Sequence, residues 1–403
     1  MYKPETCANE IGPKSQHDFS LVLGGPLYQL LRRGRLTDDA MELVHRRIIA
    51  AIAICWVPLL ILSMAQGQLL DGGVAVPFLK DVEAHIRLLV VVPLLIGAEL
   101  IVHRRTHRLV SQFEERDLIP ERDVGRFDSA VSSALRLRNS LIAEVVLVAI
   151  VYGVGVMIIW RHFMALDTTS WHAVQTAEGH TPSLAGLWYA FISLPVAQFL
   201  QIRWYFRIFI WARFLWQVSR IELRLLPTHP DRAGGIGFLS NVIYSYIPLL
   251  MAHGAILAGF YAGRIFHGGS SLMDFKIETL IMVTFLLCLV QGPLLVFAPQ
   301  LAAAKRLGRR EYGKLAGRYS REFDSKWLRG GASADEALLG SADIQSLADL
   351  GNSYGTVQSM RIILISREAI VFFAAAIVAP IVPLALTMMP FEELVEKLIG
   401  ILF

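Results

Sequence analysis

The chain has 403 residues, of which 54% are hydrophobic and only 18% are charged, and its mean hydropathy is +0.50. A soluble globular domain carries roughly 45–50% apolar and about 25% charged residues. The composition therefore argues against a soluble enzyme, a disordered scaffold and a free nucleic-acid-binding protein. Three cysteines, Cys7, Cys55 and Cys288, are an odd number without metal-ligand spacing, so they predict neither a disulfide framework nor a zinc site.

Seven apolar runs of the sequence are long enough to cross a hydrocarbon core of about 30 Å. We therefore predict an all-α fold, a polytopic integral membrane helix bundle of about seven spans. The predicted spans cover about 48–66, 86–103, 141–160, 184–202, 240–263, 277–298 and 369–389.

Positive charge orients the predicted spans. With the N-terminus in the cytoplasm, the segments that lie inside the cell hold 32 of the 38 Lys and Arg residues. Basic loops are retained on the cytoplasmic side of a membrane. The net charge of +4 divides into +8 inside and −4 outside, so we expect the N-terminus inside and the C-terminus outside. The inner segments are 1–47, 104–140, 203–239 and 301–368.

The inner segments also predict helical extensions of the spans. A near-continuous helical pattern covers 184–226, with a kink at Pro195 and an end at Pro227. Span six continues into the cytoplasmic region, where 330–342 form a flexible link and 341–350 a short amphipathic helix capped by Ser341 or Asp343. The predicted organisation is a cytoplasmic segment 1–47, spans one to six over 48–300, a cytoplasmic helical region 301–368, span seven at 369–389 and an interfacial amphipathic helix at 390–403.

The most distinctive motif, LPTHPDRAGGIGF, starts at Leu226 and joins spans four and five on the cytoplasmic side. Its glycines allow backbone N–H groups to turn toward an anion, and an arginine beside a helix N-terminus suits a phosphate or carboxylate. The alternative, more frequent for such motifs, is a rigid corner in which Asp231 caps span five. The residues expected to bind an anion or a lipid headgroup are His229, Asp231, Arg232, Gly234 and Gly235.

Three segments of the chain, HPDRAGGIGFL, SADIQSLADLGNSY and PIVPLALTMMPFEELVEKLIGILF, resemble a family of uncharacterised bacterial multi-pass membrane proteins. The resemblance covers the C-terminal half, from Leu226 onward. It implies a multi-pass protein of the bacterial inner membrane, and it implies no activity, cofactor or catalytic residue.

Polar side chains inside the apolar spans form a second set of candidates, because such groups usually face a bundle interior or a water-filled cavity. His253 lies near the middle of span five, and histidine titrates near physiological pH. These groups predict either a polar route through spans four to six or hydrogen bonds between helices. The expected route residues are Gln198, Gln201, Asn241, Tyr246, His253 and Gln291.

Other ionisable residues have simpler interpretations. Glu99, His103 and His107 follow one another at the inner end of span two, where neighbouring arginines repel a cation and favour a Glu–His pair over a metal. Glu144 is expected to extend toward the inner surface near Arg136 and Arg138. We expect no metal site in the outer loop, because its polar residues match no compact motif. They are His162, Asp167, His172, Glu178 and His180.

Span five also carries small residues at four-residue spacing, Ala255, Gly259 and Gly263, which let helices approach closely. We therefore expect it to be a central helix or an oligomer contact. The regular arginine array of a voltage sensor is absent from span four, and its inner arginines suit anionic lipid headgroups at the cytoplasmic face.

The leading functional hypothesis is passage of a small ion or solute by a homo-oligomeric channel or transporter, with an arginine-lined inner vestibule that favours anions. The first alternative is a non-conducting scaffold or sensor that binds a cytoplasmic partner. The second is a lipid-headgroup enzyme with His229 as acid/base. We assign no catalytic residue, cofactor, metal or nucleic-acid partner, and the sequence favours a protein that is not an enzyme, since it contains no hydrolase, nucleotide-binding or zinc motif.

Overall fold

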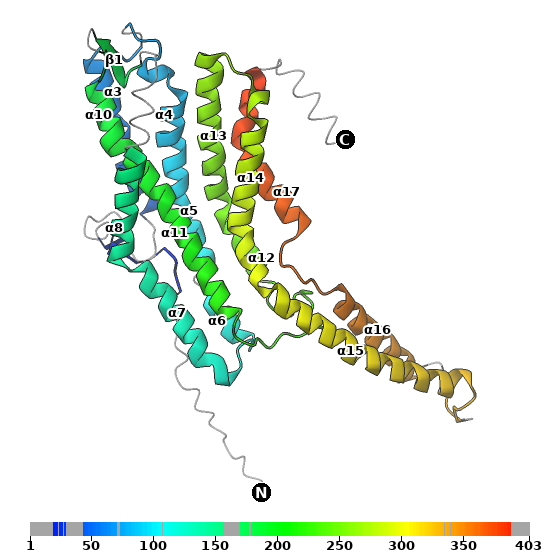
Figure 1. The fold of residues 1–403 in the computed structure, drawn as a ribbon. Helices are drawn as coiled ribbons and strands as arrows, with labels where there is room; N and C mark the ends of the chain where they lie inside the picture. The colour runs from blue at the N-terminus through cyan, green and yellow to red at the C-terminus, as the bar shows by residue number, and fades with distance from the viewer. Residues whose placement is uncertain are drawn as a thin grey trace.

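The computed structural model describes residues 19–22, 24–26, 28–29, 43–70, 73–106, 108–156, 170–176, 179–333, 335–338 and 340–387. This part of the chain is mostly helical. It contains six helices that are long and apolar enough to cross a membrane, or seven if one bent pair forms a single span. The fold is therefore a multi-pass membrane helix bundle, as the sequence predicts (Figure 1).

Each span is a chain of helical segments in which the helix type changes locally. Span one comprises α2 (Val44–Cys55) and α3 (Val57–Ala65), and span two comprises α4 (Val82–Ile86), the π-helix η2 (Arg87–Val91), α5 (Val92–Thr106) and α6 (Leu109–Glu115). Span four comprises α10 (Leu184–Trp188), the π-helix η5 (Tyr189–Ser193) and α11 (Leu194–Val218), and span five comprises α12 (Leu239–Val242), the 3₁₀ turn η6 (Ile243–Tyr246) and α13 (Ile247–Gly268). Spans six and seven comprise α14 (Lys276–Gln291) with η8 (Gly292–Phe297), and α17 (Arg367–Val378) with η10 (Ala379–Thr387).

Prolines account for several of these changes of helix type. Pro58, Pro195 and Pro248 each stand in the first turn of a helix, α3, α11 and α13 respectively. Proline is tolerated there because its missing N–H has no partner within the helix. The kink predicted at Pro195 is realised as the π-helical turn η5 directly before α11.

Span three is the bent pair. The helix that starts with η3 (Glu121–Asp123) and continues as α7 (Val124–Arg138) meets α8 (Leu141–Ile150) and the π-helix η4 (Val151–Val156) at 47°. Ser140 caps α8 by accepting a hydrogen bond from the backbone N–H of Ala143 at 3.2 Å. The apolar run predicted at 141–160 therefore begins at a capped helix, and its last residues lie outside the described part.

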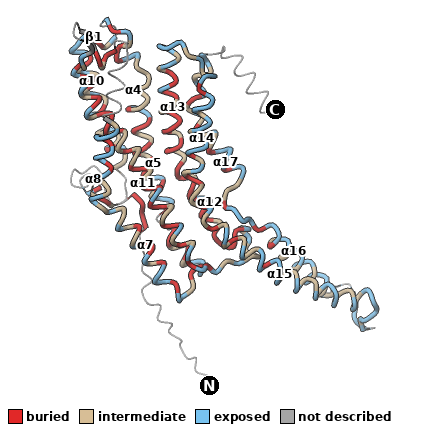
Figure 2. The backbone as a smooth tube through the Cα atoms, in the orientation of Figure 1, coloured by how far each residue is buried: buried red, intermediate tan, exposed pale blue. Residues whose placement is uncertain are grey.

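The fifth span is the centre of the bundle. Helix α13 packs between α4 and α5 on one side and α17 and η10 on the other. Its small residues face these neighbours: a Cβ at Gly254 would overlap the carbonyl oxygen of Ile377, and one at Gly259 would lie 3.3 Å from the Cα of Glu83. Of the two expectations for this span, a central helix is confirmed (Figure 2).

The two ends of the bundle differ. A β-hairpin of β1 (Ala173–Thr176) and β2 (Gly179–Pro182), with Ala173 opposite Pro182, covers one end, which we call the hairpin end. The sequence suggested only a polar loop here. At the opposite end, the arm end, α15 (Ala298–Phe323) and α16 (Ala342–Ser359) project away from the bundle as an antiparallel pair. Most of this arm is exposed (Figure 2).

The arm differs in length from the prediction. Span six does continue into it, through η8 into α15 and then the π-helical turn η9 (Asp324–Leu328). Ser341 caps α16, as expected, by accepting from the N–H of Asp343, but the helix extends to Ser359 instead of ending near 350. The extension is held by packing, since Gly308 of α15 lies against Val357 of α16 and Pro227.

The helix predicted to extend from span four to residue 226 is wrong in its last part. Helix α11 ends at Val218, and the following residues form turns and irregular structure. The side-chain Nε2 of Gln300 donates to the carbonyls of Ser219 and Ile221 at 2.8 and 2.6 Å, and the N–H of Arg224 donates to the carbonyl of Leu118. These tertiary hydrogen bonds replace those of a helix. The interfacial helix predicted at 390–403 lies outside the described residues.

Candidate functional site

A cluster of buried charges joins four spans near the arm end. The carboxylate of Glu99 in α5 is 2% exposed and lies 2.5 Å from Arg47 of α2 and 2.7 Å from Arg207 of α11. Arg203, one turn before Arg207, lies 3.6 Å from Glu99 and 3.5 Å from Glu144 of α8. We call these five residues the buried charge cluster. Such groups in a membrane span mark functional sites by default, because burying each ion costs several kcal/mol.

The buried charge cluster corrects one prediction. Glu99 pairs with arginines of other spans and not with His103, whose Nδ1 instead lies 2.9 Å from the hydroxyl of Ser20. Glu144 contacts Arg203 at 3.5 Å and lines the same hollow as Arg138, near which it was expected. The physical reason for the Glu99 pairing is that α2, α5 and α11 bring its partners together inside the bundle, where opposite charges attract more strongly than exposed ones.

His253 has a complete set of hydrogen-bond partners. Its Nδ1 lies 2.7 Å from the carbonyl oxygen of Leu249, and its Nε2 lies 2.7 Å from the hydroxyl of Tyr205 on α11. A carbonyl only accepts, so Nδ1 donates to Leu249 and Nε2 accepts from Tyr205 in the neutral ring. The Tyr205 hydroxyl is in turn 3.4 Å from the side-chain nitrogen of Gln201. The structure thus links Gln201 to His253 through a tyrosine that sequence reasoning omitted.

The remaining route residues are placed separately. Tyr246 is fully buried beside Trp204, and its hydroxyl has no hydrogen-bond partner among the described residues. The side-chain nitrogen of Gln291 and the side-chain oxygen of Gln198 are likewise buried without a partner in that part of the chain. Gln198 faces Gly155 of η4, away from the set around His253. Asn241 lies at the arm end.

The glycine-rich loop before span five folds around one carboxylate. Asp231 accepts hydrogen bonds from the N–H groups of Ala233, Gly235 and Gly237 at 2.8, 3.2 and 2.9 Å. Burial acts to raise the pKa of Asp231, but these amides and His229 outweigh it and hold the pKa below its usual value. Gly234 has φ +66° and Gly235 has φ +100°, a region that favours glycine. The amides expected to face an external anion therefore bind the loop's own carboxylate.

The other loop residues support this arrangement. The Nδ1 of His229 lies 2.9 Å from Asp231, which orients the imidazole toward the loop. Arg232 is exposed and has φ +53°, and its carbonyl accepts from the N–H of Arg361 at 2.7 Å. The corner thus fixes the segment between α16 and α17 against the start of span five.

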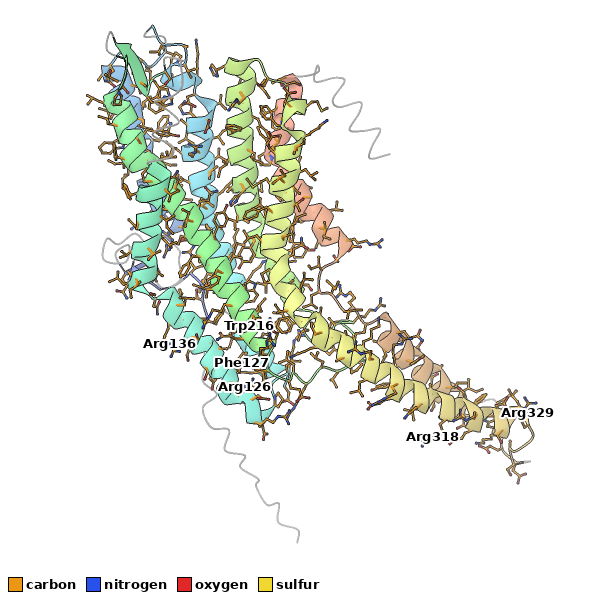
Figure 3. The ribbon with its side chains drawn as sticks, in the orientation of Figure 1. Arg126, Phe127, Arg136, Trp216, Arg318 and Arg329 are labelled. Atoms are coloured by element: carbon orange, nitrogen blue, oxygen red, sulfur yellow. The ribbon has the colours of Figure 1, made fainter. Side chains whose placement is uncertain are left out.

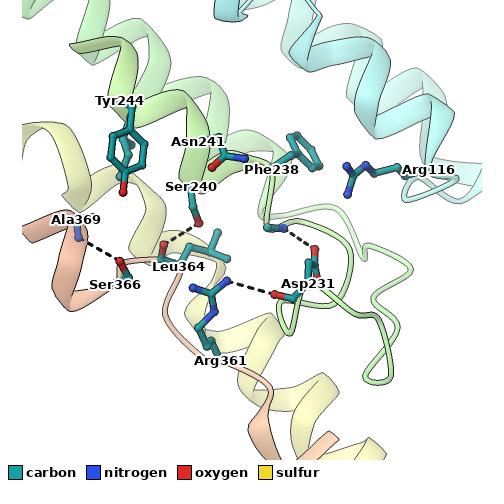
Figure 4. A pocket seen from close by; sticks show the side chains of 12 residues that line it. Arg116, Asp231, Phe238, Ser240, Asn241, Tyr244, Arg361, Leu364, Ser366 and Ala369 are labelled. Atoms are coloured by element: carbon teal, nitrogen blue, oxygen red, sulfur yellow. Dashed lines mark hydrogen bonds between the residues drawn. The ribbon is translucent and has the colours of Figure 1, made fainter. Parts of the chain in front are cut away.

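A cleft lies next to this loop at the arm end. It consists of two adjoining hollows of about 390 and 360 Å³, the first of which is shown in Figure 4, and they share Arg116, Phe238 and Asn241. Arg361 points into the first hollow, where its guanidinium donates to the backbone oxygen of Asp231 at 3.2 Å. Arg105 lines the second and donates to the backbone oxygen of Asn241 at 3.3 Å. We call this the arginine cleft.

The arginine cleft carries excess positive charge. Three guanidinium groups, from Arg105, Arg116 and Arg361, line it, and the only lining carboxylate, among the described residues, is that of Asp231. The loop amides already bind this carboxylate. Polar groups from Gln112, Ser240 and Ser366 complete the walls, although the Ser366 hydroxyl also caps α17. The cleft therefore suits a small anion or an anionic group of a larger solute.

At the hairpin end, polar groups also pair among themselves. Asp81 accepts from the indole N–H of Trp171 at 2.8 Å and the N–H of Ala84 at 3.0 Å, and lies 3.4 Å from His172. Burial acts to raise the pKa of Asp81, but these partners outweigh it and lower the pKa from its usual 3.8 to about 2. No group of three or more metal-ligating side chains occurs in the described part of the chain. His162, Asp167 and Glu178 lie outside it.

Sequence reasoning missed the arginines that matter most here. Arg47, Arg203 and Arg207 were counted as basic residues near the membrane surface, and Arg361 was not singled out. One signal was available: Arg47, Glu99, Glu144 and Arg203 all stand at the inner ends of predicted spans, hence at one depth. Opposite charges at equal depth predict an ion pair between spans, although they do not tell which spans are neighbours.

No protein-family model, no curated protein and no solved structure matches this chain. The resemblance of its C-terminal half to bacterial multi-pass proteins therefore stays a prediction. The function has to be argued from the residues themselves.

Proposed function

We propose that this membrane protein passes a small anion or anionic solute, and that the arginine cleft is the binding site at the cytoplasmic mouth. The proposal includes the orientation expected from the charge distribution, with the arm end inside the cell, and a place in the bacterial inner membrane. In this orientation, the end of the protein that binds the anion is also the end that carries the net positive charge. A homo-oligomer stays part of the proposal.

The observation that carries the proposal is the buried hydroxyl of Tyr246, which has no hydrogen-bond partner among the described residues. Asn241 and Tyr244 line the arginine cleft, and Tyr246, two residues beyond Tyr244 at the end of η6, is fully buried against Trp204 of α11. A buried polar group without a partner costs about 1–3 kcal/mol, which water or a solute at this position would offset. His253 lies two turns deeper along α13 and contacts the same helix, α11, through the hydroxyl of Tyr205.

The buried charge cluster supports preference for anions. Three arginines, Arg47, Arg203 and Arg207, share the carboxylates of Glu99 and Glu144 among the described residues. Buried positive charge raises the local concentration of anions and repels cations, an effect that salt screens only weakly inside a protein.

The experiment is an ion-flux assay with the purified protein in liposomes. We expect flux of small anions such as chloride or nitrate, and little flux of potassium. Arg116→Gln, which removes one cleft charge from an exposed side chain, should lower anion flux several-fold at low salt. The matched control is Arg321→Gln, an exposed arginine on the arm. Equal loss in both variants, or no anion flux from folded wild-type protein, would contradict the proposal.

A second candidate function rests on the arm. Four exposed cations of α15 fall within an arc of about 80° at 100° per residue, on the side away from α16. They have no ion-pair partner within the described part of the chain, and they are Arg306, Arg310, Lys314 and Arg321. Figure 3 shows the side chains of the arm, with Arg318 and Arg329 labelled. Such a surface fits an acidic cytoplasmic protein.

This scaffold function predicts a specific binding result. Replacing the four cations by Gln should abolish crosslinking of a cytoplasmic partner to the arm, while anion flux stays unchanged. Replacing Arg46 and Arg136, exposed arginines outside the arm, is the control. Crosslinking that survives the four substitutions would exclude the basic side of α15 as the contact.

A further inference from the structure

An apolar groove with one charged end runs along the outside of the bundle. Its volume is about 500 Å³, and its walls come from α2, α5, α8 with η4, and α11. Apart from Arg47 at one end and Tyr152, every lining side chain is aliphatic or aromatic. The lining residues that the argument uses are Arg47, Ala51, Ile54, Tyr152 and Phe199.

The groove lies within the half of the membrane that is nearer the arm end. On α2 it extends from Arg47, one turn inside the arm end, to Ile54, which is about 10 Å at 1.5 Å per residue. On α11 it lies against residues 195–200, in the middle of span four. It therefore reaches from the buried charge cluster to the centre of the bilayer, the depth of an acyl chain in the leaflet at the arm end.

The groove is apolar because small and β-branched residues line it. Ala50 and Ala51 leave space on α2 that larger side chains would fill, and Val148 and Val151 form the opposite wall. The Tyr152 hydroxyl donates to the carbonyl of Phe191 at 3.1 Å, so this phenol presents its ring and not a free polar group. A polar solute gains no hydrogen bonds there, whereas an acyl chain can fill the groove with van der Waals contacts.

The charged end favours a negative headgroup. Arg47 belongs to the buried charge cluster, in which three guanidiniums share two carboxylates of the described chain. Arg46, the residue before it, is exposed at the same helix end. A cation near the membrane surface attracts the headgroup of an anionic lipid.

We propose that the groove holds one acyl chain of an anionic phospholipid, with the headgroup at Arg46 and Arg47. The site is independent of solute passage, so a protein without flux can still bind the lipid. An arginine at the head and an apolar groove at the tail together discriminate against both zwitterionic lipids and free phosphate.

The test measures lipid retained by the detergent-purified protein in native mass spectrometry. The probes are phosphatidylglycerol and phosphatidylcholine of equal chain length. We expect the wild-type protein to retain one molecule of phosphatidylglycerol per chain. Ala51→Phe, which fills the groove, should lower its retention about tenfold. Ile281→Phe is the matched control, because Ile281 is 63% exposed on α14, away from the groove. Arg46→Gln should reduce the preference for phosphatidylglycerol without loss of folded protein.

Two results would overturn the proposal. Equal retention of both lipids by the wild type would show that the headgroup is not recognised. Equal retention by wild type and Ala51→Phe would show that the groove does not hold the chain, whether another segment of this protein or a second copy covers it. A melting curve for each variant separates loss of lipid from loss of fold.

Discussion

The Glu99→Gln variant tests the buried charge cluster most severely. The substitution keeps the shape of the side chain and removes the charge that Arg47, Arg203 and Arg207 share. Two of these contacts, at 2.5 and 2.7 Å, have the length of charge-assisted hydrogen bonds. Removing one partner of a buried ion pair leaves the other charge uncompensated and typically costs about 3–5 kcal/mol.

We therefore expect Glu99→Gln to lower the free energy of unfolding by about 3–5 kcal/mol. The measurement is equilibrium unfolding in mixed micelles at increasing SDS mole fraction, monitored by tryptophan fluorescence. Glu115→Gln is the control, because Glu115 is exposed at the end of α6. The double variant Glu99→Gln, Arg207→Gln should be more stable than the sum of the two single losses, since it removes both members of one pair.

The reasoning would be refuted if Glu99→Gln lowered the free energy of unfolding by less than about 1 kcal/mol, which is the contribution expected of an exposed ion pair. An additive double variant would also refute it, because independent residues have no coupling energy.

Three further predictions concern other parts of the molecule. Asp231→Ala should lower the free energy of unfolding by about 2 kcal/mol, because three loop N–H groups lose their acceptor. Limited proteolysis measures this effect, since a protease should cleave the loop faster in the variant. An unchanged cleavage rate would contradict the prediction. Asp81 has a pKa lowered to about 2, so its ionised carboxylate contributes about 2 kcal/mol to the free energy of unfolding above its unfolded pKa. This contribution is lost as the pH falls from about 4 toward 2. In Asp81→Asn the unfolding free energy should no longer depend on pH in this range. Gly254→Ala should destabilise the protein, because the added Cβ overlaps the backbone of Ile377. Gly97→Ala should stabilise it by about 0.5–1 kcal/mol, because no atom lies within 4 Å of the added Cβ. Melting temperatures that shift in the same direction in both variants would disprove this contrast.

The positions of the spans could be predicted from the sequence because each is a long apolar run whose length is set by the bilayer. The cap at Ser341 follows from local chemistry and is found. The end of α11 could not be predicted, because Gln300, distant in sequence, supplies the hydrogen bonds that replace the helix.

The candidate site was predictable only where its contacts are local. The corner around Asp231 is such a case, but the expectation that Asp231 caps span five is wrong, because the amides that it binds belong to its own loop and α12 has no side-chain cap among the described residues. Glu99 was assigned to His103, four residues away, because spacing along one helix is visible in a sequence. Its actual partners come from α2 and α11, and the pairing of spans depends on packing that periodicity does not encode.

The central claim, passage of an anion along the polar side of span five, is tested most directly by Tyr246→Phe with two readouts. The substitution removes only a buried hydroxyl that has no partner within the described chain. If Tyr246 had only a structural role, this substitution would leave anion flux unchanged. We predict that unfolding stability stays equal or rises while anion flux in liposomes falls several-fold, because the solute or its water loses a partner. Tyr312→Phe on the arm is the control. Unchanged flux in Tyr246→Phe, with wild-type flux present, would contradict the account.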